Sequence, residues 1–388
     1  MYRTKLYKFF SLLMVAGMLL SAVAPAGAVA APLQQEAANQ AEADAPELQP
    51  IVEAELAAQF TAEGSAGYLI YFREKADLSP ASTMDWETRG NFVMEALKAT
   101  AARTQASVRA YLDSQGVEYR AFWIDNIIAV DTSSATVFNG LLSFPEIEIL
   151  RAHRVLGIIE PEVETGLSST MAIEPNLTHV RADQVWNDLG ITGEGSVVAN
   201  IDTGVRYTHL ALNSQYRGNL GSGNYEHNYN WFDPYGQYDY PFDGNGHGSH
   251  TMGTMIGDDG ADNQIGMAPG AEWMACRGCS TNSCGDVELL ACAEFIAAPW
   301  DLNESNPDPS KRPNVVNNSW GDCGQSYDPW YQGVVDSWHA AGVYPVFSVG
   351  NASNCGYPEP PGLNTVGNPG RYGNVTGVGS TGRDNGEY

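Results

Sequence analysis

The chain has 388 residues, of which 43% are hydrophobic, so it can bury a sizeable core, and its length is typical of two or three domains. Its 46 acidic residues against 20 basic ones give a formal net charge of −26. This excess of negative charge argues against nucleic acid or an anionic membrane surface as a binding partner.

The first thirty residues have the pattern of a secretory signal peptide. Arg3, Lys5 and Lys8 precede an apolar run, and small residues end the segment at Ala30. The alternative is a membrane-spanning helix, but glycine, serine and proline interrupt the run and it is short for a span. We therefore expect residues 1–30 to be removed, leaving a secreted chain without a membrane span.

The segment 31–66 combines acidic residues with Ala, Gln and Pro and contains no Lys or Arg. It shows no sustained apolar period. This composition predicts an acidic linker or disordered pro-segment before the first folded domain.

Residues 67–160 carry the pattern of a small α+β domain. Apolar residues alternate over 67–73 as in a strand and recur at helical spacing over 84–116, where Gly116 would end the helix. Two strands are expected next, at 117–124 and 126–131, joined by a turn at Asp125-Asn126. A helix at 133–142 and a strand at 146–150 follow them. The order βαββαβ predicts a ferredoxin-like sandwich.

From about Ile173 the pattern changes to strands that alternate with helices. Strands are expected at 196–201, 272–276, 314–320 and 344–350, and helices at 177–190, 286–298 and 330–342. This alternation predicts an α/β domain over 173–388 with a doubly wound parallel sheet. Functional residues of such sheets lie just past the carboxyl ends of strands.

Six cysteines lie in the last third of the chain, at 276, 279, 284, 292, 323 and 355. In an exported protein they favour disulfides, although their 15 pairings cannot be distinguished from sequence. The alternative is a zinc site at the C-x2-C pair, but the later spacings match no zinc pattern.

Two candidate proton-transfer residues follow predicted elements. Asp202 comes directly after the apolar strand, so its carboxylate would be desolvated at the rim of the sheet. His247 stands among glycines, as at a helix start that presents a side chain into a cleft. An aspartate can orient an imidazole that acts as general base. The alternative for Asp202 is an aspartate that caps a turn. The alternative for His247 is a histidine whose hydrogen bonds are satisfied within a turn, but this suits His250 better, which we expect to lie deeper on the same side of the helix.

Asn351 also follows an apolar strand, next to Gly350. A side-chain amide there can donate a hydrogen bond to a developing oxyanion. Alone, Asn351 would equally suit a turn or a glycosylation site, since Asn351-Ala352-Ser353 is an acceptor motif. Together, however, Asp202, His247 and Asn351 supply the orienter, base and oxyanion donor of acyl transfer.

Several motifs resemble successive blocks of the subtilisin-like serine proteases, the peptidase S8 family: VVANIDTGV, GHGSHTMGTMIG, IGMAPGA, NVVNNSWG and VFSVGNAS. Others are similar to the bacillopeptidase F branch of that family: HNYNWFDP, ACRGC, LLACAEFIAAPWDLN and RPNVVNNSWG. The resemblance implies that Asp202 is the triad aspartate, His247 the base and Asn351 the oxyanion donor. It also implies that residues 67–160 are an inhibitor-like propeptide that acts as intramolecular inhibitor and folding template.

The same resemblance implies a serine nucleophile in a Gly-Thr-Ser-Met-Ala block past Asn351, and no such block occurs in the sequence. The G-x-S-x-G motif of another hydrolase fold is absent too. Ser353 and Ser380 lie in glycine-rich stretches without a nearby base. We therefore expect this sequence to be a C-terminally truncated fragment of a longer product.

The resemblance also implies that Ser319, Trp320 and Gly321 bind an extended peptide by strand addition. Trp320 could equally be core packing. Catalysis would need no cofactor. Asp233, Asp239 and Asp243 could hold a structural calcium ion through oxygen ligands, although a solvated acidic loop is the more common outcome.

The sequence therefore predicts a secreted serine endopeptidase that is synthesised as a zymogen and cleaves proteins or peptides. The alternative is a non-catalytic secreted peptide-binding protein built on a decayed protease fold, which a stop codon directly after Tyr388 would favour. A cell-surface structural module is a third option, against which the joint presence of Asp202, His247 and Asn351 argues.

Overall fold

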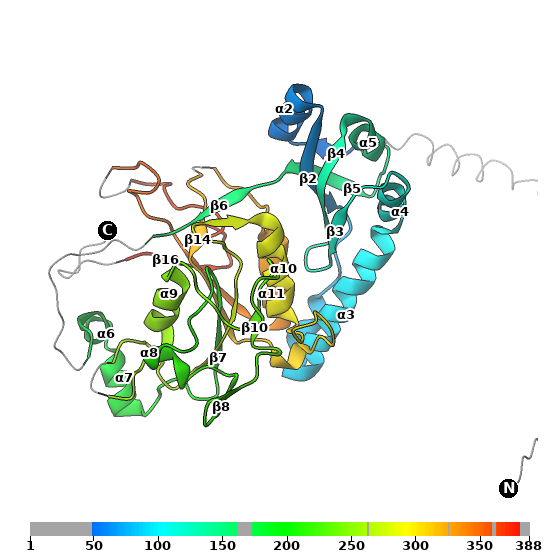
Figure 1. Cartoon of the computed structure of the whole chain (residues 1–388). Coiled ribbons are helices and arrows are strands. Elements are labelled where there is room, and N and C mark those ends of the chain that lie inside the picture. Colours follow the sequence, from blue (N-terminus) through cyan, green and yellow to red (C-terminus); the bar gives the residue numbers. More distant parts are fainter. Residues whose placement is uncertain (1–48, 161–172, 262–263, 325, 359–361, 381–388) are drawn as a thin grey trace, which may run out of the picture. The chain divides into compact units, whose positions relative to one another are not determined.

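The computed structural model describes residues 49–160, 173–261, 264–324, 326–358 and 362–380, all of which fall in one unit of the chain (Figure 1). The predicted signal peptide and the first part of the predicted linker lie outside the described residues. Two large sheets, one from each half of the described chain, form its framework.

The first sheet has five strands in the order β1-β5-β2-β4-β3. Its strands are β1 (Ile51–Val52), β2 (Ser65–Phe72), β3 (Tyr119–Phe122), β4 (Ile127–Ser134) and β5 (Ile147–Ala152). Its helices are α2 (Ala54–Glu63), the 3-10 helix η1 (Ser79–Thr83), α3 (Trp86–Thr104), α4 (Ala106–Ser114) and α5 (Ala135–Leu141). From β2 to β5 the elements follow the βαββαβ order that the sequence predicts, and β2 pairs antiparallel with β4 and β5.

The first two elements differ from the linker expected over 31–66. Strand β1 pairs parallel with β5, and helix α2 ends at Gly64 in the left-handed conformation (φ 73°). Only Leu56 of this helix is fully buried. A helix that buries one residue leaves no apolar period in the sequence, so composition alone could not reveal it.

The helix expected over 84–116 is two helices, α3 and α4, which meet at Gln105. The buried Gln105 side chain donates hydrogen bonds from Nε2 to the carbonyl oxygen of Phe122 (3.1 Å) and to Asn126 Oδ1 (3.0 Å). Asn126 adopts a positive φ of 53° in the turn between β3 and β4, where the sequence predicts a turn. The side chain of Gln105 thus ties the bend between the helices to this turn.

The second sheet has six strands in the order β10-β11-β7-β13-β15-β16, and every neighbouring pair is parallel. They are β7 (Val197–Ile201), β10 (Trp231–Phe232), β11 (Glu272–Cys276), β13 (Val315–Asn318), β15 (Tyr344–Ser348) and β16 (Thr376–Val378). The four strands expected from the sequence correspond to β7, β11, β13 and β15. Because β11 and β13 lie on opposite sides of β7, the strand order reverses there, which is where ligand sites of such sheets form.

Helices cover both faces of this sheet, as a doubly wound fold requires. The helices in this half are α6 (Pro175–His179), α7 (Ala182–Leu189), α8 (Leu210–Asn213), α9 (His247–Ile256), α10 (Asp286–Ala297), α11 (Gln332–Ala341) and the 3-10 helix η2 (Pro309–Lys311). Trp231, Trp273 and Met252 form a core on the α9 side, whereas Leu289 and Phe295 belong to a core on the α10 side. None of the helices in the described ranges is long and apolar enough to cross a membrane.

Two small sheets complete the fold. Strand β6 (Val155–Ile158) lies between β12 (Ser283–Gly285) and β14 (Trp320–Gly321) and runs antiparallel to both. Figure 1 shows β6 leaving the five-stranded sheet and reaching β14. The sequence analysis predicts no strand at β6. A hairpin of β8 (Asn219–Gly221) and β9 (Asn224–Tyr225) forms the other small sheet.

Helix α10 contacts β3 of the five-stranded sheet as well as β7 and β11 of the parallel one, and α11 contacts α3 and η1 as well as β15. Glu294 on α10 is buried, and its Oε1 accepts the backbone N–H groups of Trp123 and Ile124. Ser337 on α11 donates to the carbonyl oxygen of Ile124 at 2.8 Å. The end of β3 is therefore capped by side chains from the other half of the chain.

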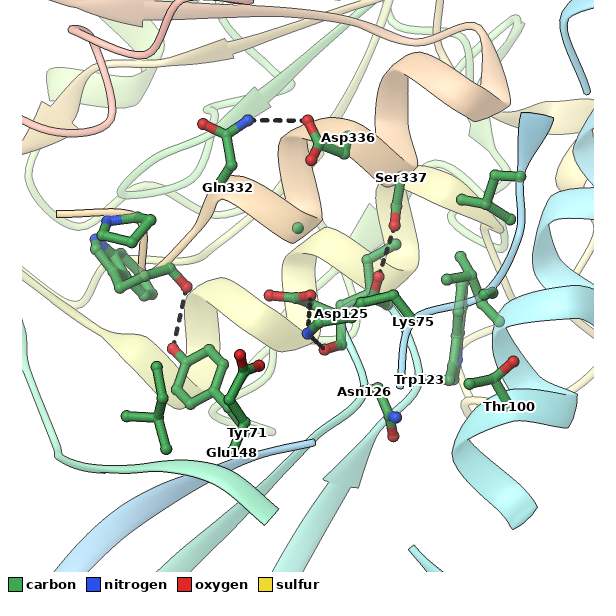
Figure 2. A pocket seen from close by; sticks show the side chains of 18 of the residues that line it. Tyr71, Lys75, Thr100, Trp123, Asp125, Asn126, Glu148, Gln332, Asp336 and Ser337 are labelled. Carbon is green, nitrogen blue, oxygen red and sulfur yellow. Dashed lines mark hydrogen bonds and ion pairs between the residues drawn. The ribbon is translucent and has the colours of Figure 1, made fainter. Parts of the chain in front are cut away.

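A cavity of about 470 Å³ lies between the five-stranded sheet and α11 (Figure 2). Lys75 Nζ donates to both the carbonyl oxygen (2.8 Å) and the carboxylate (2.7 Å) of Asp125. Burial raises the pKa of Asp125, and the charge of Lys75 opposes this. The Tyr71 hydroxyl donates to the carbonyl oxygen of Trp330 at 3.0 Å. The hydrogen bond from Tyr71 thus crosses between the two halves, whereas the Lys75–Asp125 pair lies within the first half.

The six cysteines form three disulfides, Cys276–Cys292, Cys279–Cys284 and Cys323–Cys355. The prediction of disulfides is confirmed. The zinc alternative is wrong, because the two cysteines of the C-x2-C pair are bonded to different partners. Cys276–Cys292 joins β11 to α10 within one core, and Cys279–Cys284 lies between β11 and β12.

The Cys276–Cys292 disulfide bridges a sequence separation of 16 residues. We expect that replacing both cysteines by alanine lowers the free energy of unfolding by about 3 kcal/mol, because the unfolded chain regains the entropy of the open loop. Guanidinium unfolding followed by tryptophan fluorescence measures the change. A loss of less than about 1 kcal/mol would show that this disulfide is not a major source of stability.

Candidate functional site

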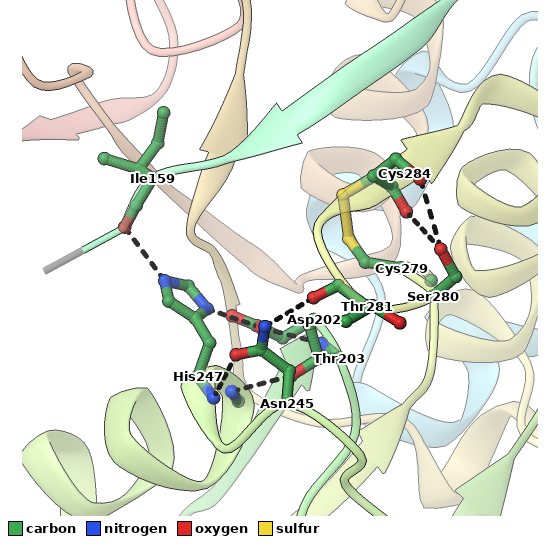
Figure 3. The surroundings of a disulfide bond; sticks show 12 residues. Ile159, Asp202, Thr203, Asn245, His247, Cys279, Ser280, Thr281 and Cys284 are labelled. Atoms are coloured by element: carbon green, nitrogen blue, oxygen red, sulfur yellow. Dashed lines mark hydrogen bonds and ion pairs between the residues drawn. A yellow bond between two sulfur atoms is a disulfide. The ribbon is translucent and has the colours of Figure 1, made fainter. Parts of the chain in front are cut away.

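Asp202 and His247 face each other past the end of β7. Strand β7 ends at Ile201, so Asp202 is the first residue beyond its carboxyl end, where the strand order reverses. His247 is the first residue of α9. Its Nδ1–H donates to Asp202 Oδ1 at 2.7 Å (Figure 3), and the two side chains are 2% and 1% exposed. The structure thus forms the buried Asp–His pair that the sequence predicts.

Two positions near His247 require glycine. Gly246, the N-cap of α9, has a φ of 100°, which L side chains rarely adopt. A Cβ on Gly248 would lie 2.0 Å from the carbonyl oxygen of Gly204, in the turn after Asp202. The glycines around His247 therefore let the start of α9 approach the turn after β7.

The carboxylate of Asp243 anchors the start of α9. It accepts hydrogen bonds from the N–H groups of Gly246 (2.8 Å) and Ser249 (2.8 Å) and from the hydroxyl of Thr203 (2.9 Å). The Thr203 hydroxyl oxygen in turn accepts the N–H of Gly248 at 3.0 Å. A negative charge at a helix N-terminus is favourable, so Asp243 both caps α9 and ties it to the residue after Asp202.

Burial and pairing shift the pKa values of the two residues. Burial lowers the pKa of His247, but the hydrogen bond and charge of Asp202 raise it more, so the net pKa lies above 6.5. Burial raises the pKa of Asp202, and the hydrogen bond from His247 opposes this. The N–H of Thr203 (2.7 Å) and the hydroxyl of Thr251 (3.3 Å) also donate to the Asp202 carboxylate. The carboxylate is therefore bonded on both oxygens.

The segment 155–160 lies against this pair. His247 Nε2 is 2.9 Å from the carbonyl oxygen of Ile159, and Asn351 Nδ2 donates to the carbonyl oxygen of Glu160. A carbonyl oxygen only accepts hydrogen bonds, so both nitrogens of His247 carry protons in this arrangement. Asn351 follows β15 after Gly350 and is thus brought to the same stretch of chain as the pair. His247 and Asn351 thus contact this segment directly, and Asp202 is connected to it through His247.

The residues 319–321 contact the segment through their backbone. The carbonyl oxygen of Ser319 accepts the N–H of Ile159 at 2.9 Å, and β14 pairs with residues 157–158. The Trp320 side chain is fully buried and packs edge-on against Phe347, with ring centroids 5.4 Å apart. The backbone of Trp320 therefore forms the edge that pairs with β6, whereas its side chain packs in the core.

His250 differs from expectation, and two carboxylates of the acidic loop bind protein donors. His250 is exposed on α9 rather than deeper than His247. The carboxylate of Asp233 accepts the N–H groups of residues 237 and 238 and pairs with Arg277 at 3.3 Å. Asp243 is saturated by the donors described above, whereas Asp239 is exposed. The carboxylates of Asp233 and Asp243 are thus engaged by protein donors, and a calcium ion at this loop stays a prediction.

Within the described ranges, no group of three or more His, Cys, Asp or Glu side chains is arranged to hold a metal ion. The charged side chains near the Asp202–His247 pair are instead engaged with one another or with backbone donors.

Two residues that hold the site were missed in the sequence. Asn200 lies fully buried inside β7, and its Nδ2 donates to the carbonyl oxygen of Gly248 and to Thr251 Oγ1, both at 2.9 Å. Asn245 Oδ1 accepts the N–H of His247 at 3.0 Å. A polar amide inside an apolar strand needs partners, and this signal could have identified Asn200. Nothing distinguishes Asn245 in a stretch rich in Asn and Gly.

The fold and the site define a doubly wound α/β protein with a buried Asp–His pair at the carboxyl ends of its strands. The Subtilase family model matches residues 193–387, which is half of the chain. The chain therefore belongs to the subtilase family.

Individual proteins are also similar to this chain. The chain is 35% identical to bacillopeptidase F of Bacillus subtilis (strain 168) over 319 residues, which cover 78% of this chain and 22% of that protein. It is 28% identical to the alkaline protease of Alkalihalobacillus alcalophilus over 246 residues, 63% of this chain and 54% of that protein. The crystal structure of fervidolysin from Fervidobacterium pennivorans aligns with a TM-score of 0.44 at 15% identity, over 80% of this chain and 44% of that one. The chain thus spans only part of the length of these relatives.

We expect that Asp202→Asn lowers the pKa of His247, because the carboxylate is the group that raises it. An NMR titration of the imidazole nitrogens in the chain of 388 residues measures the change. Asp239→Asn is the matched control, since it removes an exposed carboxylate from the preceding loop and should leave the titration as it is. An unchanged His247 titration in Asp202→Asn would contradict the coupling.

Proposed function

We propose that this protein is a secreted serine endopeptidase of the subtilase type, made as a zymogen whose N-terminal part occupies its own active site. The observation that carries the proposal is the carbonyl oxygen of Ile159, which lies 2.9 Å from His247 Nε2. A peptide group of this chain thus occupies the place where a substrate peptide group would react. Membership of the subtilase family supports the same activity.

The proposed reaction is acyl transfer from a peptide bond to a serine. The serine oxygen attacks the carbonyl carbon while His247 Nε2 takes the hydroxyl proton, and Asp202 stabilises the imidazolium. Asn351 donates a hydrogen bond to the oxyanion. The C–N bond then breaks as His247 returns the proton to the leaving amine, and water releases the acyl group by the same steps. This chemistry needs no cofactor.

We propose that the nucleophilic serine comes from a part of the protein beyond the present sequence. A Gly-Thr-Ser-Met-Ala block is not found in residues 1–388. The limited coverage of bacillopeptidase F, 22% of its length, leaves room for such a block.

Substrates of this enzyme are proteins or peptides bound in extended form. Strands β12 and β14 hold β6 between them in this structure, and the same two edges would accept a substrate strand once β6 has left. Main-chain hydrogen bonds then supply affinity, while pockets for alternate side chains supply selectivity. Leu156 and Ile158 are buried whereas Gly157 between them is exposed, which supports such alternation.

Residues 67–160 are proposed to be the propeptide, acting as inhibitor and as folding template for the domain over 173–388. The contacts of Glu294 and Ser337 with the end of β3 support the template role, because parallel sheets with non-local pairings fold slowly without assistance. Secretion is supported by the three disulfides, which persist in oxidising compartments. Residues 1–30 would be the signal that directs export.

Sequencing the source DNA past the codon for Tyr388, followed by expression of the complete reading frame, tests the proposal. We expect a serine block in frame, secreted protease activity on casein, and a mature N-terminus that begins at residue 160 or 161. An immediate stop codon would refute the proposal and favour peptide binding without catalysis. An active secreted enzyme that retains residues 31–160 would refute the zymogen part.

In the complete enzyme, His247→Ala and Asp202→Asn should each lower kcat by about 10⁴-fold or more, because both residues take part in the proton transfer.

Asn351→Leu should lower kcat by about 10²–10³-fold with little change in KM, because its hydrogen bond strengthens only as the oxyanion forms. Steady-state kinetics on a peptide substrate measure both. Equal effects on kcat and KM at Asn351 would assign it to substrate binding instead.

The contact between the five-stranded sheet and α10 should weaken as the pH rises. Burial lowers the pKa of His153, but its hydrogen bond and ion pair with Asp286 and the charge of Asp131 raise it above 6.5. A raised histidine pKa means that the stabilisation is complete at low pH and is lost as the pH rises through that pKa. Burial raises the pKa of Glu294 to about 7, which also favours the protonated folded state at low pH.

We therefore expect the Tm of the chain of 388 residues to fall as the pH rises from about 5 to about 8. His153→Gln should flatten this dependence, whereas His179→Gln, which removes an exposed histidine on α6, should not. Scanning calorimetry across the range measures both. A Tm that rises with pH in the native chain would contradict the direction of these shifts.

A further inference from the structure

The disulfide Cys279–Cys284 closes a small loop that touches three parts of the candidate site (Figure 3). Both cysteines are fully buried, whereas residues 281 and 282 between them are exposed. Hydrogen bonds from the N–H of Ser280 to the carbonyl oxygen of Ser283 (2.9 Å) also close the loop from inside. The loop 279–284 is thus both cross-linked and internally hydrogen-bonded.

One end of the loop is fixed to the aspartate of the Asp–His pair. The N–H of Cys279 donates to the carbonyl oxygen of Asp202 at 3.0 Å. The other end enters β12, where Cys284 is the register partner of Leu156 in β6. The disulfide therefore joins the strand end that carries Asp202 to the edge that binds an extended peptide.

The middle of the loop is fixed to the histidine. Asn245 Nδ2 donates to the carbonyl oxygen of Thr281 at 2.6 Å, while its Oδ1 accepts the N–H of His247 at 3.0 Å. Figure 3 shows Asn245 between His247 and the loop. A single side chain thus transmits the position of the loop to the first residue of α9.

Apart from its direct continuation into α10, the edge has few contacts that hold it. Strand β12 has three residues and pairs with β6 only, among the described strands. A strand of three residues is held by few main-chain hydrogen bonds. When β6 is replaced by another peptide, the disulfide links β12 to the segment after β11 that is hydrogen-bonded to Asp202, while α10 holds the other end of β12.

We propose that the loop 279–284 and Asn245 position the peptide-binding edge β12 relative to the Asp202–His247 pair. The inference rests on the proposed protease function of that pair. Cys279, Cys284 and Asn245 are positioning residues, because none of them touches the reacting atoms. Their effect on rate follows from geometry, since a displacement of about 1 Å can cost about 10²-fold in rate.

The Cys276–Cys292 disulfide supplies a matched control. It lies three and eight residues away in the same core and closes a longer loop. Cys276 also bonds to Asp202, since its carbonyl oxygen accepts the N–H of Asp202 at 3.2 Å, but neither cysteine of this disulfide belongs to the strand that pairs with β6. Because a longer loop contributes more stability, Cys276→Ala/Cys292→Ala should lower Tm more than Cys279→Ala/Cys284→Ala. For kcat/KM we expect the opposite order, with the larger loss in Cys279→Ala/Cys284→Ala.

In the complete enzyme, we expect Cys279→Ala/Cys284→Ala to lower kcat/KM by about 10–100-fold with a raised KM, and the control pair to lower it by less than about 2-fold. Asn245→Ala, with all disulfides intact, should lower kcat and leave KM nearly unchanged, because it displaces His247 rather than β12. An equal loss of kcat/KM in both disulfide variants would overturn the proposal, as would a wild-type rate in Asn245→Ala.

Amide hydrogen exchange in the chain of 388 residues provides a readout that needs no catalysis. The amides of residues 155–158 should exchange faster in Cys279→Ala/Cys284→Ala than in the control pair. If these rates are equal, the positioning of β12 is refuted. If the complete native enzyme is inactive while the exchange rates differ as expected, the protease function fails and the positioning of β12 stands.

Discussion

The constraint on which the site depends is the burial of the Asp202 carboxylate. With 1% of its surface exposed, this charge has lost its water and must be compensated by donors from the protein. His247, Thr203 and Thr251 supply them, and two of these three residues lie in α9. The start of α9 must therefore approach the end of β7 closely, which only glycine permits at position 248.

The hydrogen bond with which His247 compensates the charge of Asp202 also affects the protonation state of His247 while segment 155–160 lies beside it. Nδ1 donates to Asp202, and Nε2 faces the carbonyl oxygen of Ile159, so the ring holds two protons. An imidazolium cannot accept another proton and is therefore no general base. In the proposed zymogen, the segment would therefore block the pair in two ways, because it fills the space beside Nε2 and stabilises the doubly protonated ring.

The sequence could predict the residues whose position follows from one local pattern. Asp202 ends an apolar strand and His247 stands in a glycine-rich stretch, so both were identifiable without knowledge of the fold. Strand β6 was not, because a four-residue strand that pairs only with β12 and β14, more than a hundred residues away, leaves no local signal.

The acidic loop shows a second limit of sequence reasoning. Asp233 and Asp243 have the composition of calcium ligands, but the structure turns their oxygens toward backbone N–H groups and toward Arg277. The number of carboxylates in a loop is visible in the sequence, whereas the direction in which each one points depends on turns that only the fold determines. The prediction that His250 lies deeper than His247 is wrong for a related reason. A spacing of three residues on a short helix does not specify which side of the helix faces the core.

The register of β6 depends on the buried carboxylate of Asp286. Strand pairing alone specifies it weakly, because the two edges are three and two residues long. Asp286 directly follows β12 and accepts both His153 Nδ1 (3.0 Å) and the N–H of Arg154 (2.8 Å), the two residues just before β6. A slip by one residue would leave this carboxylate buried and unpaired, at a cost of about 3–5 kcal/mol. The ionic contacts at residues 153 and 154 thus select which carbonyl oxygen reaches His247, five residues farther along the chain.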